Sequence, residues 1–366
     1  MNFLKGLFGK SDEAEGDRAY DDFWTWFLKQ EKAFAQVLRD RDDVEDKFMK
    51  PVAARLKTVR EGLYVLVGVM NDVVDLTISA DGNVKMIVFA EELVSAAPEI
   101  DGWRISALKP PEPMETLRLE MRDLVFDVHR ISFYSNDTIG YPDLVDITIV
   151  HQDLNAENEP VIESGVYVFL EHLLGELEFV EAVDKLQVIG PAAAERERVS
   201  ISKLKDFLAW RKEEFVEKYD SARYNTETDG YAALNGRLPD GTPLIATVND
   251  TLLEWDRKAS HPWILRVSVA YNSSTGQNMP DKATYALLDN LEEDINAELK
   301  DEDGYLNVGR QTGGGVREVY FACRDFRKPS KVLDKLTGVY ADRFKISYDL
   351  YRDKYWRSFE RFRVGH

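Results

Sequence analysis

The stretch NVGRQTGGGVREVYFACRD, residues 307–325, decides how the C-terminal half of the chain folds. A phosphate-binding loop requires GxxxxGK[ST] at a strand-to-helix turn, where backbone N–H groups and a helix N-terminus face the phosphates. Gly309 to Gly314 is followed here by Gly315 and Val316, without a lysine and a hydroxyl residue. The residues after the glycines are typical of a strand. The stretch therefore predicts a hairpin in which glycines supply the positive φ angles of the turn.

The segments on either side of this hairpin predict two helices and two further strands. Residues 263–271 alternate between apolar and polar side chains, as a half-buried strand does. Residues 281–300 have one apolar helical face, and a second such helix begins at Pro329. With a last strand at 345–353, the order is strand-helix-strand-strand-helix-strand, that of a ferredoxin-like fold. Two earlier apolar runs around Asp240-Gly241, residues 230–238 and 243–250, predict an added hairpin.

The N-terminal part combines helices with two blocks of strands. Residues 18–61 have apolar side chains at helical spacing. Two blocks then follow, at 62–111 and 124–190, and each predicts the order strand, strand, helix, strand. We expect an α+β protein with the following parts: a flexible tail at 1–17, an N-terminal α+β domain at 18–190, a linker and helix at 191–221, and the ferredoxin-like domain at 222–366. Whether the two blocks share one sheet stays open.

The charge of the chain excludes some partners and favours others. There are 47 basic and 66 acidic residues, a formal net charge of -19. A field of this sign repels nucleic acid phosphates and anionic membrane surfaces, and it suits a protein partner with a basic surface. Cys323 is the only cysteine, so no internal disulfide forms, and a buried structural thiol in a reducing compartment is expected. We expect a soluble cytoplasmic protein without cofactors.

The N-terminal sequence MNFLKGLFGKSDEAEGD has no apolar core of signal-peptide length. Its apolar residues share one face of a short helix: Phe3, Leu4, Leu7 and Phe8. A frayed tail is the favoured interpretation, and a weak membrane-surface anchor is the alternative. No other segment reaches transmembrane length without charges.

Three histidines in the second N-terminal block, His129, His151 and His172, are the candidate metal ligands. Three imidazoles would suit zinc or iron, but no HExxH-like spacing supports such a site. Exposed or singly hydrogen-bonded histidines are the favoured interpretation, and we expect no metal. Acid pairs such as Glu254 and Asp256 are expected on solvated faces, and the nucleophile pattern GxSxG is absent, so no catalytic residue is assigned.

RNA-recognition modules with this fold stack bases on aromatic side chains of the strand that corresponds here to residues 316–325. If Phe321 and Cys323 face the core, Tyr320 and Arg324 face the other way. A single tyrosine beside Glu318 is a poor platform for stacking bases. The sequence therefore predicts no nucleic acid partner.

The C-terminal segment DKYWRSFERF, residues 353–362, combines aromatic and basic side chains. One interpretation is a terminal helix that packs on the sheet. The other is a contact site for another protein, because Trp, Tyr and Arg are effective anchors. The candidate interaction surface consists of Tyr320, Arg324, Tyr355, Trp356, Arg357 and Arg361.

Several of these segments resemble a bacterial family catalogued as domain of unknown function 695. The resemblance covers roughly 225–364 and rests on these stretches: 263–271, GQNMP at 276–280, the helix around Leu291-Glu292, 308–325 and 353–362. It implies an α+β domain without an established activity, and no catalytic residue is transferred. Family members sometimes occur beside a domain similar to a protein regulator of ribonuclease E, which favours regulation over catalysis. Residues 79–103 also look like bacterial proteins of unassigned role.

Together these features favour a non-enzymatic, cytoplasmic interaction or regulatory protein that acts through protein–protein contacts. The alternative is an enzyme of hydrolase type with its site in a cleft between the two domains. The sequence leaves the identity of the partner and the oligomeric state open.

Overall fold

The computed structural model describes residues 11–273 and 278–363. Its contacts divide the chain into two compact units. The N-terminal unit contains Met1–Tyr134 and Ile147–Lys205, and the C-terminal unit contains Ser135–Asp146 and Asp206–His366. The segment 135–146 thus belongs to the C-terminal unit, although in the sequence it interrupts the N-terminal unit. The domain limits expected above stay a prediction. Of the tail expected at 1–17, residues 1–10, with the anchor, lie outside the described residues, and residues 11–17 are helical.

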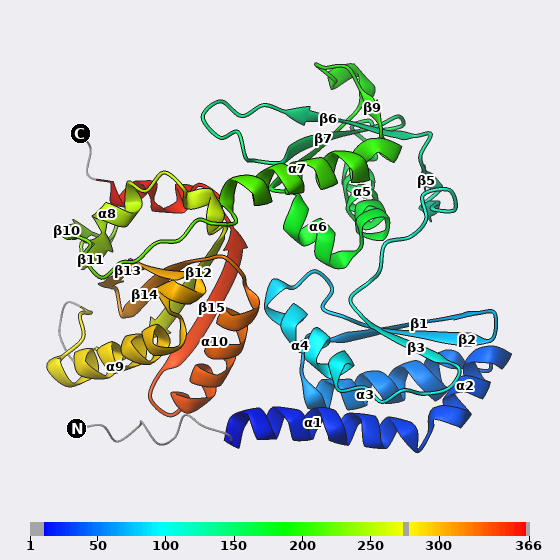
Figure 1. Cartoon of the computed structure of the whole chain (residues 1–366), viewed down its shortest axis with the longest axis horizontal. Coiled ribbons are helices and arrows are strands. Elements are labelled where there is room, and N and C mark those ends of the chain that lie inside the picture. The colour runs from blue at the N-terminus through cyan, green and yellow to red at the C-terminus, as the bar shows by residue number, and fades with distance from the viewer. Residues whose placement is uncertain (1–10, 274–277, 364–366) are drawn as a thin grey trace. The chain divides into compact units, whose positions relative to one another are not determined.

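The first block of the N-terminal unit is a three-stranded sheet with helices on one face (Figure 1). Its elements are α1 (Ser11–Leu28), α2 (Glu31–Asp40), the π-helical turn η1 (Glu45–Met49), α3 (Lys50–Val59), β1 (Tyr64–Met70), β2 (Val73–Ser79), α4 (Val84–Ser95) and β3 (Trp103–Ala107). The strand order is β1-β2-β3, with β3 parallel to β2. Aromatic rings from α1 and η1 pack against Trp103: Phe27 lies 5.0 Å from it edge to face, and Phe48 lies 6.4 Å from it.

The second block forms a separate sheet, with the order β8-β7-β6-β9. Its elements are β4 (Leu119–Met121), β5 (Leu124–Phe126), β6 (Ile131–Asn136), β7 (Asp146–His151), α5 (Glu159–Leu174), α6 (Glu176–Ala182), β8 (Lys185–Ile189), η2 (Pro191–Ala193), β9 (Val199–Ser200) and η3 (Ile201–Lys203). In both blocks the strand after the helix pairs with the second strand of the preceding pair. The two blocks therefore repeat one arrangement in two sheets.

A buried carboxylate joins the two blocks. Glu176, at the start of α6, is 1% exposed. It accepts hydrogen bonds from the Ser79 hydroxyl at 2.8 Å and from three backbone N–H groups at 3.0 to 3.1 Å, those of Ala80, Gly82 and Lys109. These donors lie where β2 and β3 end, so Glu176 holds the turn before α4 in place.

The C-terminal unit has the expected ferredoxin-like order. Its elements are α7 (Leu204–Tyr219), which begins at the boundary between the units, β10 (Tyr231–Arg237), β11 (Pro243–Asn249), α8 (Asp250–Leu253), η4 (Lys258–Ser260), β12 (Trp263–Ala270), α9 (Lys282–Glu298), η5 (Asp301–Asp303), β13 (Tyr305–Gly313), β14 (Val316–Cys323), α10 (Arg327–Val339), β15 (Lys345–Arg352) and η6 (Arg357–Phe362). The sheet order is β10-β11-β13-β14-β12-β15, so the added hairpin, β10 and β11, extends the sheet beside β13. The α+β class is confirmed.

The glycines of residues 309–315 shape the central hairpin. Gly313 pairs with Val316, and the two residues between them, Gly314 and Gly315, have φ of +62° and +80°. Both angles lie in the left-handed region that glycine adopts at little cost. Gly309, with φ of +138°, lies at a register shift where β11 approaches so closely that an added Cβ would be 2.4 Å from the Thr247 carbonyl oxygen. The hairpin leads into a strand, so a phosphate loop is excluded.

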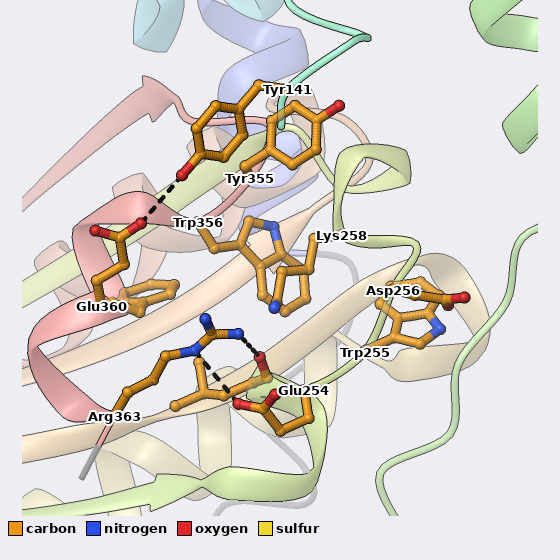
Figure 2. Close-up of a pocket in the computed structure, with 11 residues that line it drawn as sticks. Tyr141, Glu254, Trp255, Asp256, Lys258, Tyr355, Trp356, Glu360 and Arg363 are labelled. Carbon is orange, nitrogen blue, oxygen red and sulfur yellow. Dashed lines mark hydrogen bonds and ion pairs between the residues drawn. The ribbon is translucent and has the colours of Figure 1, made fainter. Parts of the chain in front are cut away.

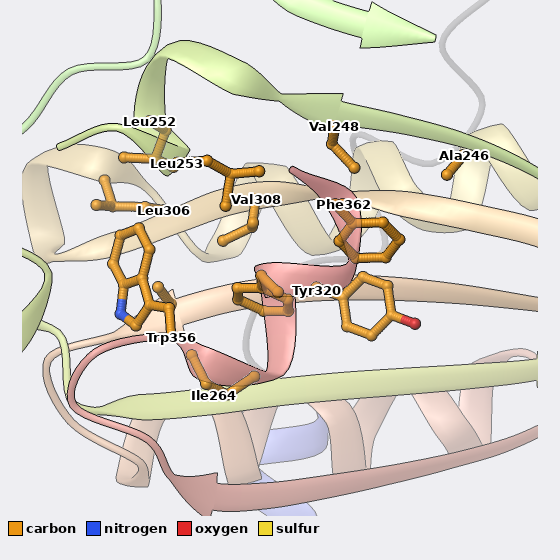
Figure 3. Packing of buried hydrophobic residues seen from close by; sticks show 12 residues of the cluster. Ala246, Val248, Leu252, Leu253, Ile264, Leu306, Val308, Tyr320, Trp356 and Phe362 are labelled. Atoms are coloured by element: carbon orange, nitrogen blue, oxygen red, sulfur yellow. The ribbon is translucent and has the colours of Figure 1, made fainter. Parts of the chain in front are cut away.

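The two faces of this sheet are covered differently. Helices α9 and α10 contribute Leu291, Leu333 and other buried residues on one face. The C-terminal segment covers the opposite face, where the rings of Phe359 and Phe362 lie 5.5 Å and 5.8 Å from that of Tyr320. Trp356 belongs to the same buried cluster (Figure 3). This cover is a 3₁₀ helix. Within the described residues, no helix is both long and apolar enough to cross a membrane.

Candidate functional site

The C-terminal cover places the six predicted interaction residues in different settings. Tyr320 and Trp356 are 1% and 2% exposed, and their rings belong to the core. Trp356 donates its indole N–H to the backbone oxygen of His261 at 2.9 Å. The face that would stack nucleic acid bases is thus filled by the chain's own aromatic residues.

The other predicted residues lie nearer the surface. Arg361 is exposed and donates to the hydroxyl of Tyr320 at 2.9 Å, and Arg357 is exposed with its guanidinium 5.4 Å from the ring of Tyr141. Half-buried Arg324 donates to the backbone oxygen of Ala222 at 3.1 Å. These arginines contact other residues of the C-terminal unit, and their part in a partner interface stays a prediction.

A pocket of about 240 Å³ opens beside this segment. Two stretches and one distant residue of the C-terminal unit form it: residues 253–258 from the end of α8, residues 355–363, and Tyr141. The lining residues are Tyr141, Leu253, Glu254, Trp255, Asp256, Lys258, Tyr355, Trp356, Phe359, Glu360 and Arg363 (Figure 2). Aromatic rings therefore form much of its wall, with charged groups among them.

The rings of the pocket are packed against one another. Tyr141 and Tyr355 lie edge to face at 4.8 Å, and Trp255 lies 6.1 Å from Trp356. Trp356 has a φ of +55°, a conformation that a bulky residue rarely adopts and that its surroundings must enforce. The wall of the pocket is thus fixed by packing before any ligand arrives.

The charges of the pocket are mixed. Glu254, Asp256 and Glu360 are exposed acids, as expected for the first two. Arg363 lies 3.3 Å from Glu254 and donates to the backbone oxygen of Leu253 at 2.9 Å. The ammonium of Lys258 lies 6.0 Å from the ring of Trp356, and burial, followed by the charge of Arg363, lowers the pKa of Lys258. The carboxylates thus lie at the solvent side of the pocket, and the half-buried ammonium of Lys258 lies near the indole of Trp356.

The carboxylate of Asp143 makes several of the contacts that hold the stretch containing Tyr141. Asp143 accepts from the hydroxyl of Tyr355 at 2.6 Å, from that of Tyr219 at 2.8 Å and from the ammonium of Lys218 at 2.8 Å. Although burial opposes ionisation, these donors lower the pKa of Asp143. Burial and the hydrogen bond to Asp143 raise the pKa of Tyr355. The segment 135–146 is thereby attached to α7 and to the C-terminal segment.

The three histidines have separate partners. His129 is exposed. His151 was expected to be exposed or singly bonded, but it is buried between two partners, the Val125 carbonyl oxygen at 3.1 Å and the Asp153 N–H at 3.2 Å. His172 lies 2.6 Å from a carboxylate oxygen of Glu112. Among the described residues, no group of three or more His, Cys, Asp or Glu side chains could hold a metal ion.

Cys323 is fully buried, as expected, and burial raises the pKa of its thiol. A high thiol pKa disfavours the thiolate that reactive cysteines require. The side chain therefore acts as a small apolar residue of the core.

Sequence reasoning missed several members of the pocket, among them Tyr141, Trp255 and Lys258. Trp255 carried only a weak signal, its place in a short connection, where binding residues are frequent. Tyr141 carried none, because it comes from a distant segment.

Comparison with known proteins identifies part of the C-terminal unit. A search of curated proteins found no match, and a search of solved structures found none either. Residues 237–363 match a family described as "Family of unknown function (DUF695)". The match runs from the end of β10 to the last described residue, and it includes every pocket residue except Tyr141. The suspected resemblance is confirmed: the C-terminal part of the chain, residues 237–363, matches the family of unknown function DUF695.

Proposed function

We propose that the protein is a non-enzymatic binding protein with a regulatory role, and that its pocket holds a basic segment of another protein. The observation that carries this proposal is the prearranged aromatic wall of Tyr141, Trp255, Tyr355 and Trp356. Tyrosine and tryptophan supply large contact areas and lose little side-chain entropy on binding, which makes them frequent anchors of interfaces.

The charge distribution supports a basic partner. The chain carries a net charge of -19, which attracts a basic surface over a distance. At the pocket itself, Asp256 lies beside Trp255, and Glu360 reaches toward Tyr141 (Figure 2). A lysine or arginine of the partner would place its charge at these carboxylates and its methylene groups on the ring of Trp255.

The strain at Trp356 adds independent support. A left-handed tryptophan costs roughly 1–3 kcal/mol, and such residues cluster at ligand-binding sites. The lone buried cysteine suits a reducing compartment, so we include a cytoplasmic location in the proposal.

The proposal is tested by capturing partners from native lysate with the intact protein, followed by quantitative mass spectrometry. In the pocket variant, Asp256→Lys is combined with Glu360→Lys. The matched control combines Glu213→Lys with Glu217→Lys on α7, where both acids are exposed and outside the pocket. Thermal unfolding of all three proteins shows whether each is folded.

The expected result is a set of proteins that the wild type and the control retain and the pocket variant loses. Retention should weaken as salt rises, because the interaction is between exposed charges. If a folded pocket variant retains the same proteins as the wild type, the pocket is not the binding site and the proposal is wrong.

A further inference from the structure

Strand β1 is the outer strand of the sheet β1-β2-β3, so its free edge presents unpaired backbone groups (Figure 1). Its side chains alternate between the two faces. Val65 faces the helices and is 7% exposed, whereas Tyr64, Leu66 and Met70 on the other face are 54%, 41% and 58% exposed. This free, apolar edge is a separate feature from the pocket.

The other edge strands of the protein show what β1 lacks. Monomeric proteins protect sheet edges with charges, prolines or bulges, because an unprotected edge pairs with other chains. Among the described edge strands of five or more residues, all but β1 carry at least one charge: Arg104 on β3, Lys185 on β8, Arg237 on β10, and Lys345, Asp349 and Arg352 on β15. Strand β1, with the sequence YVLVGVM, has neither charge nor proline, and its register with β2 is uninterrupted.

The sequence of β1 is complementary to itself. When two copies run antiparallel about a two-fold axis at Val67, residue 64 lies opposite residue 70 and residue 66 opposite residue 68. Leu66 then faces Gly68 of the second copy, and a Cβ at Gly68 would meet nothing within 4 Å, so space is present for the leucine. Tyr64 faces Met70 of the second copy, and both are apolar residues of considerable size.

The charges near β1 favour a second copy over a foreign basic partner. Two chains that each carry -19 repel one another unless they meet on a neutral surface. On the open face of this sheet, Asp75 of β2 is neutralised by Arg104 of β3, with Nη2 and Oδ2 2.7 Å apart. A basic partner would find no free carboxylate on these strands, whereas a second copy meets no like charge.

We propose that β1 is a dimerisation strand, which pairs antiparallel with β1 of a second copy of this chain about an axis at Val67. The contact is isologous, so it closes after two copies and joins two three-stranded sheets into one. It also explains how the exposed apolar edge avoids open-ended association.

Sedimentation analysis of the intact protein over a wide range of concentration tests the proposal. The mass should rise with concentration from the 42.0 kDa of one chain toward twice that value. A wild-type mass that stays at one chain throughout, or rises without limit, overturns the proposal.

Two double variants test the register. Tyr64→Glu with Met70→Glu places carboxylates opposite one another across the interface and should abolish the dimer. Tyr64→Lys with Met70→Glu places an ammonium opposite a carboxylate at both ends and should restore it. In the control, Tyr167→Glu with Val216→Glu, two apolar side chains that are 47% and 51% exposed elsewhere are replaced, and the dimer should persist. If both β1 variants dimerise, or if neither does, the pairing about Val67 is wrong.

Discussion

Alanine at successive glycines of the C-terminal unit should produce a graded series of stabilities. Gly315→Ala introduces a side chain at a φ of +80°, but the nearest atom to the new Cβ would be 3.5 Å away. Backbone strain alone then acts, and we expect a loss of about 1–2 kcal/mol. Gly309→Ala adds a clash, since its Cβ would lie 2.4 Å from the Thr247 oxygen and 2.7 Å from the Cα of Val248. Strands β11 and β13 must separate, so we expect a loss above about 3 kcal/mol.

Gly338→Ala is the matched control. Gly338 lies inside α10, and a Cβ there would meet nothing within 4 Å. Alanine is the better helix former, so this variant should gain up to about 1 kcal/mol. The assay is amide hydrogen exchange of peptides from β11, β13 and β14, which gives the opening free energy of this sheet separately from the N-terminal unit. Equal losses at Gly309 and Gly315 would refute the close approach of β11 to β13.

Three further variants test contacts within each unit. Burial, with a smaller effect of Arg324 and Arg223, lowers the pKa of His261 to about 3. The unfolded chain protonates this imidazole near its usual pKa of about 6.5, whereas the folded chain does not. The free energy of unfolding therefore falls as the pH drops below about 6.5, by about 2 kcal/mol at about pH 5. In urea titrations at neutral and acidic pH, His261→Gln should lose less stability than the wild type, and equal losses would contradict the burial argument. Asp143→Asn removes the charge that holds segment 135–146, so the backbone amides of this segment should exchange hydrogen faster than in the wild type. An unchanged exchange rate would show that other contacts hold the segment. Glu176→Ala leaves four hydrogen-bond donors without their acceptor. In thermal unfolding, the variant should therefore lower the stability of the N-terminal unit by at least about 3 kcal/mol. A loss below about 1 kcal/mol would show that water replaces the carboxylate.

The ferredoxin-like order was predictable because each of its signals is local. The alternation of residues 263–271, the apolar face of residues 281–300 and the glycine turn are all patterns within one element. The repeat of strand, strand, helix and strand was predictable for the same reason. The separation into two sheets was not, because it depends on which strands pair.

The pocket was beyond the reach of local patterns. Its wall depends on Asp143 meeting Tyr355 across 212 positions of the chain. Trp356 was predicted as a member of an exposed surface or of a packed helix, and sequence alone could not choose. Trp356 is packed because the second face of the sheet carries apolar residues, such as Tyr320 and Ala322, that the C-terminal segment buries.

The most direct test of the binding proposal places a photo-reactive group at the pocket. The protein with benzoyl-phenylalanine in place of Glu254 is irradiated in native lysate, and the same group in place of Glu217 on α7 serves as the control. Both positions are exposed, but only residue 254 lines the pocket, and its replacement leaves Asp256 and Glu360 intact. The account predicts covalent adducts with one or a few proteins from position 254 that position 217 does not form. Identical adducts from both positions, or none from position 254, would contradict it.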